Sequence, residues 1–167
     1  LTVNVPGTLS FSSATEVTDS SLTAQTGVVL DFAAATTLRN VNLTATGGGD
    51  ILFPVATSYT GYNYGDTTIE ASGLGSRIDL SHLDSFYGGG EHQSGGYPYP
   101  WHYYTTNVNA LAGGEIALAG AISHRNNITV DGAGSVLDVT GITQLGGTVL
   151  TVNVPGTLSF SSATEVT

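Results

Sequence analysis

The chain has 167 residues, of which 13 are acidic against three arginines and no lysine, giving a net charge of −10 at pH 7. This charge argues against nucleic-acid binding, since such binding depends on Lys and Arg neutralising phosphates, and it disfavours docking on anionic membrane surfaces. The absence of cysteine excludes disulfides and cysteine-rich zinc sites, and no apolar run approaches the ~18 residues of a membrane-spanning helix.

The residue types favour β-structure. Small and β-branched side chains dominate the apolar set, methionine is absent, and 23 residues are glycine, well above the usual ~7%. Threonine, serine and asparagine are abundant, whereas the helix-favouring mixture of Glu, Lys and Met is missing. We therefore expect an all-β fold with many tight turns.

One stretch occurs twice without a difference. Residues 1–18 read LTVNVPGTLSFSSATEVT, and residues 150–167 read the same, so the chain has an internal period of 149 residues. Repetition at a fixed period is the mark of a repeat architecture. We expect residues 1–149 to form one unit of a longer tandem array, and residues 150–167 to be the first coil of the next, identical unit.

A shorter repeat lies within the unit. Six segments begin with an apolar–x–apolar triplet, the period-two pattern of a strand with one buried face, and the repeated stretch begins a seventh. The triplets start at Leu1, Leu22, Leu43, Ile69, Val108, Ile128 and Leu150. A second triplet follows eight or nine residues later, starting at Leu9, Leu30, Ile51, Ile78, Ile116 and Leu137.

Two further columns follow each second triplet at intervals of three residues. The first holds Ala14, Ala35, Ala56, Leu83, Ala121 and Ile142. The second holds Val17, Leu38, Tyr59, Phe86, His124 and Leu145, in which His124 is the only member that breaks the apolar pattern. Glycines lie at the corner between the first two triplets, where positive φ is needed.

These columns predict a parallel β-solenoid of six coils of about 21 residues per unit. Like side chains stack from coil to coil, and each coil needs its neighbours to bury its apolar face. Coils of 20–22 residues with uneven corners favour the right-handed form. The rival is a sandwich of antiparallel hairpins, which predicts two-residue Asn-Gly or Asp-Gly turns, and only Asp131-Gly132 fits that description. Two coils carry insertions, at residues 59–67 and 87–107.

The segments GLGSRIDLSHLDSFYGG (73–89) and GAGSVLDVTGITQLGG (132–147) share the frame G-x-G-S-x-(I/L)-D-(L/V)-(S/T)-x-(L/I)-x-x-(F/L), and each ends in Gly-Gly. This frame resembles the coil repeats of giant secreted bacterial surface proteins, the β-helices of filamentous-haemagglutinin and autotransporter-passenger type. The resemblance implies a right-handed β-helix outside or on a cell that acts as stalk, adhesin or fibre. It implies no catalytic residue.

The insertions are the most informative segments after the repeat. Loops of this length in a compact fold are usually functional or disordered, and segments rich in aromatic residues are poor candidates for disorder. Tyr and Trp are the residues that anchor interfaces. They are also stacking platforms for sugar rings. An alternative is that both insertions fold onto the flank of their own solenoid and pack together. The candidate contact residues are Tyr62, Tyr64, Tyr87, Tyr97, Tyr99, Trp101, Tyr103 and Tyr104.

Other patterns carry weaker signals. Asp31, Asp79 and Asp138 lie in alternate coils, and one interpretation is a pair of catalytic carboxylates for polysaccharide cleavage. At a strand spacing of ~4.8 Å they would lie ~10 Å apart, which exceeds the ~6.5–9.5 Å between the two carboxylates of an inverting glycosidase. An ice-binding surface would need an uninterrupted row of threonines, but Glu70 interrupts the outward column of Thr2, Thr23, Thr44 and Thr129. Threonine is better explained here as a favourable residue on a β-surface. The sequons at Asn42 and Asn127 leave glycosylation open.

We also weighed a metal site. Its candidate ligands are Asp84, Glu91, His92 and His102, but spacings across a loop do not define one. We expect no metal, cofactor or catalytic activity.

The expected function is structural. Identical tandem copies suit length and multivalency, so we expect an extracellular filament, stalk or fibre whose partner is another copy of itself through the aromatic insertions. The alternative is a carbohydrate-binding adhesin that holds glycan with the same aromatics, and a polysaccharide-cleaving enzyme ranks below both.

Overall fold

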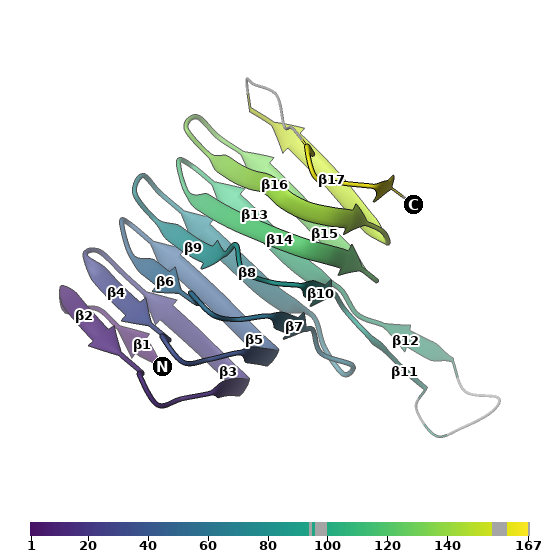
Figure 1. Ribbon diagram of the computed structural model, residues 1–167, viewed down its shortest axis with the longest axis horizontal. Helices are drawn as coiled ribbons and strands as arrows, with labels where there is room; N and C mark the ends of the chain where they lie inside the picture. Colours follow the sequence, from purple (N-terminus) through teal and green to yellow (C-terminus); the bar gives the residue numbers. More distant parts are fainter. Residues whose placement is uncertain (94, 96–99, 155–159, 167) are drawn as a thin grey trace.

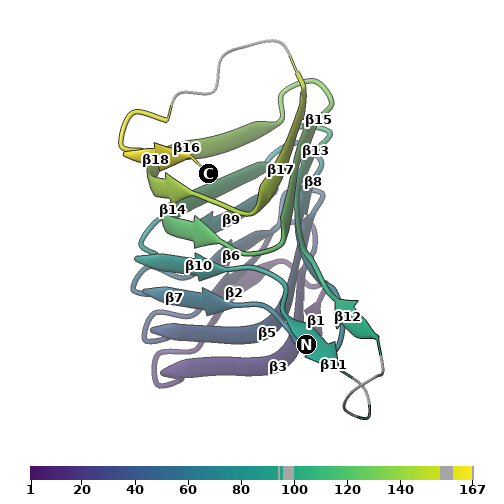
Figure 2. The same cartoon turned by 90° about the vertical axis from the view of Figure 1, so that its right-hand side faces the viewer.

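The computed structural model describes residues 1–93, 95, 100–154 and 160–166, and these form strands without any helix. The strands wind into a parallel β-solenoid of about seven turns. The coils are stacked one on another, with the N-terminal coil at one end of the stack and the C-terminal coil at the other (Figures 1 and 2). The predicted fold class is therefore confirmed, while the right-handed sense stays a prediction.

Each coil contributes strand segments to three ladders, which are the three faces of the solenoid. The first face consists of β1 (Thr2–Val3), the second part of β3 (Glu16–Ala24), the second part of β5 (Thr37–Thr46), β8 (Thr67–Ser72), β13 (Thr106–Leu111), β15 (Asn126–Asp131) and β17 (Thr148–Asn153).

The second face consists of β2 (Gly7–Ser10), β4 (Val28–Asp31), β6 (Asp50–Leu52), β9 (Arg77–Leu80) and the first parts of β14 (Glu115–Ser123) and β16 (Val136–Leu145). The third face consists of the first parts of β3 and β5, β7 (Ser58–Thr60), β10 (Ser85–Tyr87), the second parts of β14 and β16, and β18 (Glu165–Val166). All these ladders are parallel, which rules out the antiparallel sandwich.

The first predicted column is the centre of the first face. Adjacent members pair directly in the ladder from Leu22 through to Leu150, and Thr2 pairs with Thr23, which places Leu1 beside Leu22. Leu43, Ile69 and Val108 are fully buried. The outward Thr column follows the same register, with Glu70 and Asn109 in it and joined by a 3.4 Å hydrogen bond.

The second face has the predicted register as well. Leu9, Leu30, Ile51, Ile78, Ile116 and Leu137 pair in that order. Next to them Phe11, Phe32 and Phe53 stack with ring centroids 4.5 and 4.9 Å apart. Stacked rings of this kind contribute beyond the area that they bury, so the phenylalanines fill the corner of the first three coils.

The third face differs from the prediction in one coil. Phe86 pairs with Ile122, and Ile122 pairs with Leu145, so His124 is not a member of this column. Ala121 also leaves its predicted column and pairs with Ser85. The placement of both residues was wrong.

The physical reason is a shorter corner in the fifth coil. Leu80 and Phe86 are separated by a turn, whereas β14 runs without interruption from the second face to the third. Gly120 makes this possible, because it adopts a φ of +80° and lies so close to the backbone of Leu83 and Asp84 that a side chain would have no room. After Ile122 the chain uses one residue more to reach the first face than it does after Leu145, and His124 falls at this next corner.

Candidate contact site

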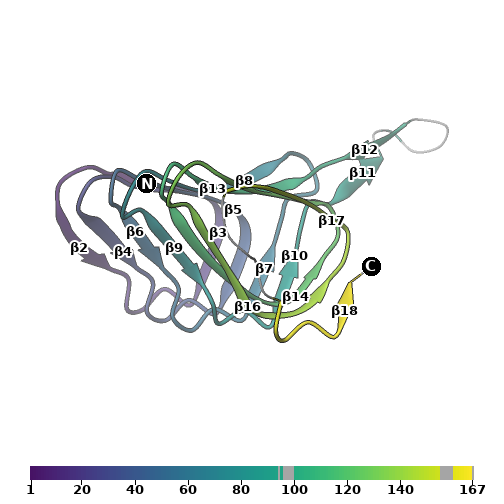
Figure 3. The same ribbon diagram turned by 90° about the horizontal axis from the view of Figure 1, so that it is seen from above.

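Both insertions leave the solenoid at the same corner, between the third face and the first. Because β8 begins at Thr67, β10 includes Tyr87 and β13 begins at Thr106, the chain outside the ladders covers residues 61–66 and 88–105. Both segments are shorter than the insertions expected from the sequence, 59–67 and 87–107. The second segment forms a hairpin of β11 (Glu91–Gln93) and β12 (Trp101–Tyr103), which projects beyond the outline of the coils (Figure 3).

The root of the hairpin is part of the solenoid. Gly88, Gly89 and Gly90 are buried, and their amides donate to backbone carbonyls of Ser123 (2.9 Å), Arg125 (3.0 Å) and Tyr62 (3.2 Å), respectively. Glycine is required here because a Cβ on Gly89 would collide with the carbonyl of Tyr104. The two strands of the hairpin, β11 and β12, therefore extend from a root, Gly88–Gly90, that is hydrogen-bonded to the rest of the solenoid.

The two insertions also contact each other. The rings of Tyr64 and His92 lie 4.3 Å apart, and the rings of Tyr62 and Tyr64 lie 5.6 Å apart. The amide of Thr105 donates to the Asp66 carboxylate at 2.8 Å. The two insertions thus pack together in part, as the alternative expected, but the hairpin projects instead of folding onto the flank (Figure 3).

A buried polar column lies beneath this corner. The Tyr59 hydroxyl lies 3.1 Å from Thr67 Oγ1, which lies 2.8 Å from Thr106 Oγ1. Burial raises the pKa of Tyr59, and the hydrogen bonds with the two threonines oppose this rise. The side-chain amide of Asn126 donates from Nδ2 to the backbone carbonyls of Ser123 and His124, at 2.9 Å each, and so fixes the corner next to the hairpin.

Sequence reasoning missed this column. Its signal was present, because Thr67, Thr106 and Asn126 each stand two residues before a member of the first apolar column and so point to the same interior. A polar residue at an inward position needs partners, and the three residues pair in register.

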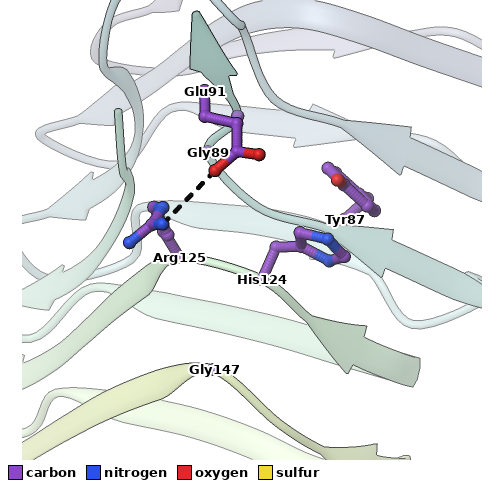
Figure 4. Close-up of a pocket in the computed structure, with 7 residues that line it drawn as sticks. Tyr87, Gly89, Glu91, His124, Arg125 and Gly147 are labelled. Carbon is purple, nitrogen blue, oxygen red and sulfur yellow. Dashed lines mark ion pairs between the residues drawn. The ribbon is translucent and has the colours of Figure 1, made fainter. Parts of the chain in front are cut away.

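A hollow of about 410 Å³ opens between the hairpin root and the following corners. Figure 4 shows its lining, in which the rings of Tyr87 and His124 face each other with centroids 3.6 Å apart. Arg125 forms an ion pair of 3.6 Å with Glu91, and its guanidinium carbon lies 4.0 Å from the centre of the Tyr103 ring. Sequence reasoning had placed His124 in the core and had not singled out Arg125, because the shift in β14 has no sequence signal.

The predicted aromatic contact residues differ in how much of their surface is exposed. Trp101, Tyr103 and Tyr64 expose 51%, 55% and 58% of their surface, and Tyr62 and Tyr87 are exposed to a lesser degree. Tyr104 is half-buried at the hairpin root. Tyr97 and Tyr99 lie outside the described residues.

The acidic column has the predicted register, with Leu52 between Asp31 and Asp79 and Ala117 between Asp79 and Asp138. Burial of Asp79 would raise its pKa, but hydrogen bonds from Ser81 and the charge of Arg77, whose Nη2 lies 2.8 Å away, outweigh burial and lower it. The arrangement keeps like charges in separate coils.

The two sequon asparagines take part in the ladders. The Asn42 side-chain oxygen accepts the backbone amide of Thr68 at 2.8 Å, and Asn127 donates to the Asn107 side chain at 3.2 Å. Among the described residues, no three His or acidic side chains are grouped to hold a metal ion. In the same part of the chain, no helix is long and apolar enough to cross a membrane.

Comparison with known proteins adds no relative. No family model, no curated protein and no solved structure matches this chain. The β-solenoid therefore stands on the structure itself, and the likeness to repeats of secreted surface proteins rests on the shared sequence frame alone.

Proposed function

We propose that this chain is one unit of a tandem array in which successive units stack end to end into one continuous solenoid rod. The observation that carries the proposal is that one coil sequence pairs along both of its edges. As residues 1–18 it pairs with the second coil, through Thr2 with Thr23 and Leu9 with Leu30. As residues 150–154 and 160–166 it pairs with the sixth coil in the first and third ladders, through Thr151 with Thr129 and Val166 with Leu145.

A single copy of this coil can therefore have neighbours on both sides at once. In an array, the sixth coil of one unit would lie below it and the second coil of the next unit above it. No exposed sheet edge is then left at a junction between units, which is the condition for a solenoid to grow without aggregating. Six coils at ~4.8 Å give a rise of ~29 Å per unit.

The role that fits such a rod is structural. We propose an extracellular filament, stalk or fibre on a bacterial surface, with the hairpin repeated once per unit as a contact point for another rod. Only 10% of the residues are charged, and Thr, Ser, Gly and Tyr are abundant. This composition supports a location outside the cell. No catalysis is part of the proposal, since Leu52 and Ala117 separate Asp31, Asp79 and Asp138 along their column.

A length series tests the stacking. Proteins of one, two and four units should form rods whose length, measured by small-angle X-ray scattering and electron microscopy, grows by ~29 Å per unit. Independent beads on flexible connections would instead give a length that scales with less than the first power of unit number, and that result would overturn the proposal.

A second candidate is carbohydrate binding at the same hairpin. The observation in its favour is that the half-exposed Trp101 lies on the same hairpin whose root borders a hollow of about 410 Å³, lined in part by the charged groups of Glu91 and Arg125. Binding on a glycan array that disappears in Trp101→Ala and persists in Leu74→Ala, a change at an exposed residue on another corner, would support this role. Equal signals from both variants would exclude it.

A further inference from the structure

The hairpin has strand edges that the solenoid does not use. β11 and β12 form a two-stranded antiparallel sheet, and within the described residues neither strand pairs with a third one. An unpaired edge presents a row of backbone donors and acceptors and is a template for pairing with another chain. Everywhere else in the coils the strands have neighbours above and below, except at the two ends of the stack.

The register shows which backbone groups of β12 face outward. The amide of Tyr104 donates to the carbonyl of Gly90 at 2.9 Å, and His102 lies opposite His92 two positions further along. Hydrogen-bonded and non-bonded pairs alternate in an antiparallel ladder, so the backbone of His102 faces β11. The N–H and C=O groups of Trp101 and Tyr103 then face the open edge.

The side chains of β12 allow a lateral contact between two negatively charged rods, because none of them is acidic. The strand reads Trp-His-Tyr and holds no acidic residue, whereas β11 holds Glu91. Residues 1–149, which form one unit, hold 12 acidic residues against three arginines and so carry a net charge of −9. Close approach of two rods is therefore favoured at an uncharged projection. Trp101 and Tyr103 are half exposed and lie on the same face of the strand, since side chains alternate.

We propose that β12 pairs antiparallel with β12 of a second copy of this chain, with His102 at the twofold axis. In this register His102 lies opposite His102 of the second copy, and Trp101 lies opposite Tyr103 of the second copy on both sides of the axis. The two outward-facing pairs form four backbone hydrogen bonds, and the aromatic residues form two cross-strand pairs. The contact is isologous, so it closes after two copies. It deepens the proposed structural function by naming the lateral contact.

The area that this contact buries predicts how strong it is. Four aromatic side chains bury ~150–250 Å² each at most, which is below the ~1,200–2,000 Å² of a stable interface. A single pair of hairpins is therefore a weak contact. A rod repeats the hairpin in every unit, and linked weak contacts add up to strong association. Single units should associate weakly, and rods of four units should bundle.

A single cysteine tests the geometry directly, because the chain has none of its own. Residues opposite each other in a non-hydrogen-bonded antiparallel pair have Cα atoms ~4.5 Å apart, within the range of ~4.4–6.8 Å that a disulfide spans. His102→Cys in the single unit should form a disulfide-linked dimer under mild oxidation at least about tenfold faster than Leu74→Cys, because the contact raises the effective thiol concentration. Leu74 is 85% exposed on another corner and serves as the control. Equal rates would overturn the proposal.

Charge reversal tests the twofold axis independently. In four-unit rods, His102→Glu and His102→Lys should each abolish bundling, because like charges would lie opposite each other. An equimolar mixture of the two variants should bundle again, since opposite charges then meet across the axis. Sedimentation gives the association and circular dichroism melting verifies that both variants fold. Bundling of either variant alone, or no recovery in the mixture, would refute the contact while leaving the length series of the rod unaffected.

Discussion

Ile122 lies directly opposite Phe86 in the third ladder of the solenoid. This pairing moves His124 out of the interior and to the corner, where its ring lies 3.6 Å from the ring of Tyr87. One change in corner length thus decides both how the fifth coil closes and which residues line the hollow beside the hairpin.

Ile122→Asp should destabilise the unit by several kcal/mol, because a carboxylate without a partner would lie between Phe86 and Leu145. His124→Asp should change the free energy of unfolding by less than ~1 kcal/mol, since His124 is exposed. Urea unfolding of the two variants measures the difference. The reverse order would mean that His124 is the core residue after all.

Gly89→Ala should loosen the root of the hairpin, because the added methyl group would meet the backbone of Tyr104. Gly65→Ala is the matched control, since its methyl group would make only ordinary contact, at 3.4 Å, with the ring of Tyr62. Hydrogen exchange at the amides of Tyr104 and Thr106 reports on the root, and it should speed up in Gly89→Ala alone. Protected amides in that variant would contradict the packing described for Gly89.

Removing the arms of the hairpin should separate folding from association. Replacement of residues 92–102 by a short Gly linker keeps the hydrogen bonds of Gly88, Gly89 and Gly90, so the melting temperature should stay within a few degrees of the parent while bundling of four-unit rods is lost. Replacement of residues 88–105 also removes the buried root and should lower the melting temperature clearly. Bundling that survives the shorter deletion would place the lateral contact elsewhere.

Asp79 should make the stability depend on acid pH. Its folded-state pKa lies below the ordinary value of 3.8, so the stabilisation is present above that value and is lost as the pH falls through the lower, folded-state pKa. The melting temperature of the parent should drop as the pH is lowered below about 4. Asp79→Asn removes the titrating group, so its melting temperature should be lower at neutral pH and should fall less with acid. An unchanged slope would show that Asp79 makes no net ionic contribution.

The regular part of this protein could be predicted from the sequence. The columns that begin at Leu1 and Leu9 follow from period-two alternation and from spacings that barely change between coils, and the side-chain direction in a strand follows that alternation. The identical stretches 1–18 and 150–167 are likewise the sequence basis of the proposed array, because the same residues would present the same edges. Local pattern is sufficient wherever each coil repeats the geometry of the one before.

The irregular part was decided only by the tertiary structure. The register of β14 depends on whether the corner after Leu118 forms a turn or runs straight. On the straight path only glycine fits at position 120, because the backbone of Leu83 and Asp84 lies against it. The burial of Gly88 likewise depends on Ser123, a residue far along the chain. Such contacts join segments with no common period, so the hollow, the hairpin root and the open edge of β12 arise from packing between coils, whereas the ladders arise from the alternation within each one.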